Sequence, residues 1–223
     1  AAAPAQPPPP NGILPANPAH GRSSKRDIRL PTARVFFLMI RRIALAFCLI
    51  TTQATAAPEA YRLDTARSTV GFTYDFPIGD NRGTMPITAA DMRIDLGNLS
   101  ASRIDVTLNA TGVRAGFPFA AEAMKGSELL DAARHPAITF RSTAITGTLQ
   151  EARITGLLTV RGVTHPVTLT AGLYRQAETD PKDLSHLTIL LTGTLNRHSF
   201  GASGYATLVG PEIGLRIVAQ VER

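Results

Sequence analysis

The stretch IGLRIVAQV, from Ile213 to Val221, shows the pattern that decides the fold. Its apolar side chains fall on every second position, with Arg216 and Gln220 between them. Successive side chains of a β-strand point to opposite faces, so this alternation places one face on a core and the other in solvent. The stretch therefore predicts an antiparallel strand with one buried side.

Six earlier runs repeat this alternation, and turn residues such as Gly97-Asn98, Gly162 and Asp180-Pro181 separate them. Short strands of one period with turns between them are typical of an all-β barrel or sandwich with antiparallel pairing. The runs are Val70, Phe72, Tyr74 and Phe76; Met92, Ile94 and Leu96; Ile104, Val106 and Leu108; Ile138 and Phe140; Val167, Leu169, Ala171 and Leu173; and Leu187, Ile189, Leu191 and Leu195.

One segment, Phe119 to Ala133, lacks the strand pattern: it is rich in Ala, Glu, Leu and Met and has no β-branched residue. Such residues favour a helix. We expect a short helix or two helical turns across one mouth of a barrel. Met124 and Leu129 then lie on one side, where they either pack against the barrel or contact a ligand.

The net charge of +6 comes from one part of the chain. Residues 1–56 hold seven Lys and Arg against the single acid Asp27, which leaves 16 basic and 16 acidic residues from Ala57 onward. A neutral body offers no attraction for a polyphosphate backbone. The charge distribution therefore argues against a nucleic-acid partner.

Residues 39–56 have the three parts of a secretory signal peptide: the basic pair Arg41-Arg42, an apolar run and small residues up to Ala56. The alternative is a membrane anchor, but the uncharged run from Ile43 has about 15 residues, short of the roughly 20 that a span requires. We expect export, cleavage after Ala56 and a folded domain over 57–223. Residues 1–38 precede Met39 and are expected to be disordered or an over-extended start.

Catalytic patterns are absent from the sequence. The one cysteine, Cys48, lies in the signal region, and the histidines stand singly, without the spacing of a zinc site. No nucleophile with a base and no carboxylate pair is visible. We therefore expect no enzyme and no cofactor; the histidines are His20, His135, His165, His186 and His198.

Several segments, in order along 61–221, resemble the YceI-like family of exported polyisoprenoid-binding proteins. They are YRLD at 61–64, STVGF at 68–72, LLD at 129–131, HPAITF at 135–140, GLLTVRGVTHPV at 156–167 and LNRHSFG at 195–201. The resemblance implies a lipocalin-like, eight-stranded antiparallel barrel located in the periplasm. It also implies a bound isoprenoid lipid, such as a quinone or a polyprenyl phosphate. Relatives often pair, so a homodimer is a further expectation.

The resemblance and the alternation together predict a continuous apolar tunnel. The inward residues that we expect to contact lipid are Phe72, Tyr74, Ile94, Val106, Leu108, Phe140, Leu158, Leu169 and Leu191, and those expected to close one mouth are Phe117, Phe119, Met124 and Leu129. Arg197, expected near the other end, is our candidate for a polar head contact, because a guanidinium suits a phosphate or carbonyl oxygen. The alternative for Arg197 is a solvated or strand-pairing role.

Two functions remain open. The first is a periplasmic carrier or reservoir for an isoprenoid-type lipid. The second is a non-enzymatic stress or adhesion module whose barrel is packed solid and which acts through its surface. An eight-stranded barrel is wide enough either to be filled by its own side chains or to hold one small ligand.

Overall fold

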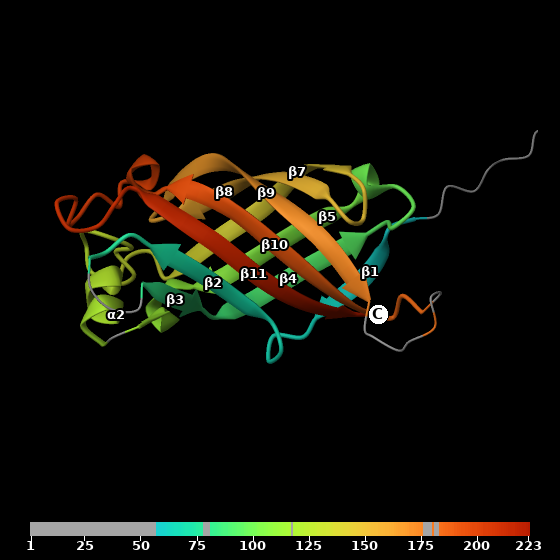
Figure 1. The fold of residues 1–223 in the computed structure, drawn as a ribbon, viewed down its shortest axis with the longest axis horizontal. Helices are drawn as coiled ribbons and strands as arrows, with labels where there is room; N and C mark the ends of the chain where they lie inside the picture. The colour runs from blue at the N-terminus through green and yellow to red at the C-terminus, as the bar shows by residue number, and fades with distance from the viewer. Residues whose placement is uncertain (1–56, 78–80, 117, 176–179, 181–182) are drawn as a thin grey trace, which may run out of the picture. The chain divides into compact units, whose positions relative to one another are not determined.

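The computed structural model describes residues 57–77, 81–116, 118–175, 180 and 183–223. The proposed signal peptide and the residues before it lie outside this part, as does Phe117. Eleven strands form one sheet (Figure 1). They are β1 (Glu59–Leu63), β2 (Thr69–Tyr74), β3 (Arg82–Met85), β4 (Ile87–Ile94), β5 (Arg103–Asn109), β6 (Arg114–Ala115), β7 (Ala137–Gly147), β8 (Ala152–Val160), β9 (Val163–Arg175), β10 (His186–Asn196) and β11 (Glu212–Glu222).

The shorter strands combine, so that the sheet closes as an eight-stranded antiparallel barrel. β1 and β2 lie end to end beside β11, which pairs with β2 at Ile213–Val218 and with β1 at Val221 and Glu222. β3 and β4 make one interrupted strand on either side of Pro86, and β5 and β6 make another around the 3-10 turn η2 (Ala110–Gly112). The predicted all-β barrel is confirmed.

Proline explains one of these interruptions. Pro86 has no backbone N–H to donate to a ladder, and such residues stand at breaks in strands. Its carbonyl oxygen instead accepts from the Asn109 N–H at 2.8 Å. The strand is thus interrupted at Pro86, while β3 keeps its pairing with β2 and β4 keeps its pairing with β5.

Every strand of the closed barrel pairs with its neighbours in sequence, so successive connections alternate between the two ends. We call the end that holds the connections after β2, β6, β8 and β10 the α2 end. The opposite end holds β1 and the C-terminus and is called the C-terminal end (Figure 1). The α2 end is named after α2 (Pro118–Lys125), which is the one α-helix among the described residues.

The helix is shorter than the segment 119–133 suggested. It stops at Gly126, whose N–H donates to the Ala123 carbonyl oxygen at 3.1 Å. The following residues form turns, in which Asp131 adopts a left-handed conformation with φ of 47°. Two further 3-10 turns are η1 (Leu99–Ala101) and η3 (Arg197–Phe200). Within the described residues, the chain forms no helix with the length and hydropathy needed to cross a membrane.

Candidate ligand-binding cavity

The barrel encloses a cavity of about 520 Å³. Apolar side chains from all around the barrel line it, and Arg197 is the one charged residue among the described residues on its wall. Val106 and Leu108 on β5 point inward yet are only half-buried, because empty space lies in front of them instead of packed neighbours. The barrel is therefore not packed solid.

Glycines on the inner face help to hold this space open. A Cβ on Gly156 would lie 2.4 Å from the Phe140 ring, and one on Gly83 would lie 2.2 Å from the Phe72 ring. Each ring thus lies across a glycine on the neighbouring strand and stays against the wall. A larger residue at either glycine would push an aromatic ring toward the centre of the cavity.

Packed side chains close the cavity at the C-terminal end. Leu187 and Val221 are each only 2% exposed there, and Tyr61 and Met92 pack in the same cluster. The Tyr61 hydroxyl donates to the Leu184 carbonyl oxygen at 3.2 Å, and burial raises the pKa of this phenol above its ordinary value. Among the described residues, this cluster fills the barrel interior at the C-terminal end.

The cavity reaches solvent at the α2 end. Phe119 on α2 is 84% exposed, and Tyr205 and Leu208, in the connection between β10 and β11, are 48% and 53% exposed. All three also line the cavity, so they form the rim of its mouth. Ala120, Ala123 and Met124 of α2 line the interior beneath them. An apolar chain can enter here without crossing a polar barrier.

Arg197 holds in place the loop that forms one side of the mouth. Its Nε donates to the Gly210 carbonyl oxygen at 2.9 Å, Nη1 donates to the carbonyl oxygens of Ala202 and Gly204, and Nη2 donates to that of Val209 at 2.7 Å. The residue is 5% exposed, and burial lowers the pKa of its guanidinium. Four of its five N–H groups are thus committed to the loop that carries Tyr205 and Leu208.

Our placement of Arg197 near the end opposite the helix is wrong. The connection after β6, which contains α2, and the connection after β10, which follows Arg197, lie at the same end of the barrel. They touch, because the Gly204 N–H donates to the Glu128 carbonyl oxygen at 3.0 Å. The alternative role in solvent or in strand pairing is also wrong, since the side chain is buried and braces a loop.

The remaining predicted residues can now be placed. All of those that the structure describes lie on the cavity wall: Phe72, Tyr74, Ile94, Val106, Leu108, Phe119, Met124, Leu129, Phe140, Leu158, Leu169, Leu191 and Arg197. Contact with a ligand stays a prediction for each. The sequence reasoning missed Tyr205, Leu208 and Phe200, which lie in an irregular connection where no strand period marks them.

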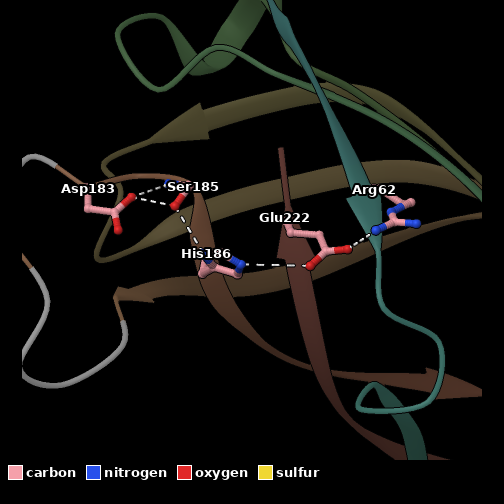
Figure 2. A network of polar contacts seen from close by, with 5 residues as sticks. All are labelled: Arg62, Asp183, Ser185, His186 and Glu222. Atoms are coloured by element: carbon pink, nitrogen blue, oxygen red, sulfur yellow. Dashed lines mark hydrogen bonds and ion pairs between the residues drawn. The ribbon is translucent and has the colours of Figure 1, made fainter.

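A polar network lies outside the cavity, at the C-terminal end (Figure 2). The Ser185 hydroxyl donates to the Asp183 carboxylate and lies 3.0 Å from His186 Nδ1, while His186 Nε2 lies 3.8 Å from Glu222. Glu222 also pairs with Arg62. The Ser185 hydrogen bond lowers the pKa of the Asp183 carboxyl.

This network has the residue types of a hydrolase triad but not their arrangement. A nucleophilic serine gives its proton to the histidine, whereas Ser185 gives its proton to Asp183. Asp183, His186 and Arg62 are exposed, Ser185 and Glu222 are half-buried, and the network joins the start of β10 to the ends of β11 and β1. No cluster of three or more metal-ligating side chains occurs among the described residues. We therefore assign the network a structural role, in which it links β10, β11 and β1 where the barrel closes.

Comparisons with known proteins agree with this architecture. A family model described as the YceI-like domain matches residues 61–221. Protein YceI of Escherichia coli O157:H7 is 35% identical over 99 residues, which cover 44% of this chain and 51% of that protein. The chain thus spans about half the length of the curated relatives it matches.

Two solved structures share the fold. BcnA of Burkholderia cenocepacia has a TM-score of 0.64 at 18% identity, over 71% of this chain and 99% of that one. A polyisoprenoid binding domain from Saccharophagus degradans, implicated in plant cell wall breakdown, has a TM-score of 0.51 at 13% identity, over 73% of this chain and 98% of that one. Since the family model covers well over half of the sequence, the chain belongs to the YceI-like domain family.

Proposed function

We propose that this protein is a periplasmic carrier for a polyisoprenoid-type apolar lipid, which it holds inside the barrel. The observation that carries the proposal is the apolar cavity of about 520 Å³ with a mouth at the α2 end. The polyisoprenoid-binding domain that shares the fold supports the same ligand class. A quinone or a polyprenyl phosphate would fit this description.

Burial of the chain is sufficient to explain binding. Transfer of one CH₂ from water to an apolar site is worth about 0.8 kcal/mol, or about 4 kcal/mol for a five-carbon isoprene unit. Ordering of the ligand and loss of its free motion offset part of this gain. A ligand of a few isoprene units can therefore bind tightly through its chain, with no catalytic group.

The alternative of a surface-acting module rests on a solidly packed barrel. The cavity and the half-buried inner face of β5 favour the carrier. Membership of the YceI-like family, together with the fold shared with a polyisoprenoid binding domain, favours a binding protein over an enzyme. The proposal includes export by residues 39–56 and a mature N-terminus at Ala57, which N-terminal sequencing of the protein from its host would test.

Extraction of bound lipid from the purified protein tests the proposal. The protein, purified without detergent, is extracted with organic solvent, and the extract is examined by mass spectrometry. We expect an isoprenoid lipid in near-stoichiometric amount. A protein that carries no lipid and takes up none when offered would instead support the surface-acting module.

A further inference from the structure

The wall between β9 and β10 is hydrogen-bonded over only part of its length. Their ladder runs from the pair Leu187 and Arg175 to the pair Thr192 and Thr170. β10 then continues to Asn196 in full pairing with β11, and the first half of β9 pairs with β8. The facing edges, residues 163–168 and 194–196, therefore have no ladder between them, whereas Gly193 still lies against β9, since a Cβ built on it would be 3.0 Å from the Thr168 carbonyl oxygen. Pro166, which has no N–H, lies on one of these edges.

An open groove runs along the outer surface over this gap. Outward side chains of the two strands line it, among them Thr168, Thr170, Thr192 and Thr194. Val167, Leu195 and Phe200 line both this groove and the inner cavity. Inward residues can reach an outer groove only where the strands part. One layer of side chains thus separates the apolar cavity from a polar groove.

A ring contact crosses this thin wall near the α2 end. His165 on β9 and Phe200 of η3 meet edge to face, with ring centroids 5.4 Å apart and planes at 84°. The contact joins two side chains without a backbone ladder. Rotation of these side chains would connect the cavity with the groove and leave the strand pairing intact.

The groove presents hydrogen-bond donors and one fixed positive charge. Arg153 of β8 lines it and is exposed, and no described carboxylate forms an ion pair with this residue. Threonine hydroxyls stand beside it, and no described residue of the lining is acidic. An oxygen-rich anion such as a phosphate matches a guanidinium and hydroxyl donors.

We propose that the gap between β9 and β10 is the head-group site, where the anionic, phosphate-bearing head of an isoprenoid lipid lies in the outer groove while its chain fills the barrel. The inference rests on the proposed function and adds the position and the chemistry of the head. Arg153 is the residue that contacts the phosphate. Arg197 is not available for this role, because four of its N–H groups already donate to backbone carbonyls.

The test compares two ligands that have the same isoprenoid chain and differ in the head group, geranylgeranyl phosphate and geranylgeraniol. Each is titrated into the delipidated protein by calorimetry. In Arg153→Gln we expect the affinity for the phosphate to fall about tenfold or more, the order of one charge-assisted hydrogen bond, and the affinity for the alcohol to stay within about twofold. Thr194→Val, which removes one groove hydroxyl at nearly constant volume, should change the affinities in the same direction by a smaller factor.

The matched control is Arg216→Gln. Arg216 is exposed on β11 directly opposite Thr192, but it does not line the groove, so its loss should leave both affinities unchanged. Inorganic phosphate in excess should not displace geranylgeranyl phosphate, because the chain supplies most of the affinity.

Three results would overturn the head-group site: equal losses for both ligands in Arg153→Gln, equal effects of the two arginine variants, or displacement by inorganic phosphate alone. The last would mean that the groove binds free phosphate. Failure of the parent protein to bind either ligand would refute the proposed carrier function itself, and is thereby distinguished from failure of the head-group site alone.

Discussion

Arg197 and Val209 are joined by a hydrogen bond of 2.7 Å from Nη2 to the carbonyl oxygen, and this bond closes a loop at the mouth of the cavity. The backbone N–H of Arg197 also donates to the end of the same loop, at the Pro211 carbonyl oxygen, over 2.9 Å. One buried guanidinium therefore holds the segment that presents Tyr205 and Leu208. The loop that forms this side of the rim is therefore held in a defined conformation by hydrogen bonds.

Replacement of Arg197 with Ala should destabilise the protein. Several carbonyl oxygens would lose a charged donor, and each such bond is worth about 1.5–3 kcal/mol, so we expect a loss of about 3 kcal/mol or more in the free energy of unfolding. Arg197→Lys should recover little, because an ammonium cannot reproduce the planar fork of donors. Urea denaturation measures both.

The comparison variant is Arg216→Ala, on the exposed face of β11, where surface substitutions change stability by about 0.5 kcal/mol at most. If Arg197→Ala were as stable as Arg216→Ala and had lost affinity only for phosphate-bearing ligands, Arg197 would be a head contact after all.

Gly156 and Phe140 form a second test of the architecture. In Gly156→Ala the new Cβ would lie 2.4 Å from the Phe140 ring and 2.6 Å from the Arg141 carbonyl oxygen. Overpacking of this kind costs about 1–3 kcal/mol, and the displaced ring should also reduce the space for ligand. Thermal unfolding and a binding titration measure the two effects.

A smaller side chain in place of Phe140 should relieve part of the clash, so Gly156→Ala with Phe140→Leu should be more stable than Gly156→Ala alone. Gly97→Ala is the control, because its Cβ would meet nothing closer than Asp95 at 3.4 Å. Equal stabilities of the two single variants would show that the ring does not lie across Gly156.

Asp183 predicts a dependence of stability on pH. The Ser185 hydrogen bonds lower the pKa of this carboxyl in the folded protein, so its ionised form is favoured by folding. Its stabilisation is fully present above the unfolded pKa of about 3.9 and is lost as the pH falls through the lower folded pKa. Asp183→Asn should therefore melt below the parent at neutral pH, and the gap should narrow in acid.

Melting curves between neutral and strongly acidic pH measure this gap. Asp91→Asn is the control, because Asp91 is exposed and its contact with Arg93 is 3.9 Å long. The same pH dependence in both variants would mean that the effect reflects overall charge and not the Ser185 hydrogen bonds.

The strands could be predicted because their period is visible in the residues themselves. On β11 the inward set Ile213, Leu215 and Ile217 follows the alternation without a break, and all three line the cavity. On β5 the same period correctly placed Val106 and Leu108 on the inner face. The empty space in front of them was not predictable, since it depends on how far apart the opposite walls lie.

The position of Arg197 could have been predicted from topology alone. In a barrel of consecutive antiparallel strands the connections alternate between the ends, so the third and the seventh lie together. The contacts of Arg197 with the loop could not be predicted, because Ala202, Gly204 and Val209 accept through backbone carbonyl oxygens. Every residue has such an oxygen, so the sequence does not reveal which ones accept. The same applies to the gap between β9 and β10, where only Pro166 gives a hint.

The central claim, that an isoprenoid chain occupies the barrel, is tested most directly by titration of geranylgeraniol into the delipidated parent, Leu191→Trp and Leu157→Trp. Leu191 lines the cavity, whereas Leu157 is 43% exposed and does not line it. The parent contains no tryptophan, so calorimetry follows binding in the parent and in both variants alike. We predict saturable binding of one ligand per chain in the parent and in Leu157→Trp. In Leu191→Trp, whose indole takes up part of the cavity and narrows the space for an extended chain, the affinity should fall at least tenfold while the protein stays folded. Undiminished binding by a folded Leu191→Trp, or no binding by the parent, would contradict the claim.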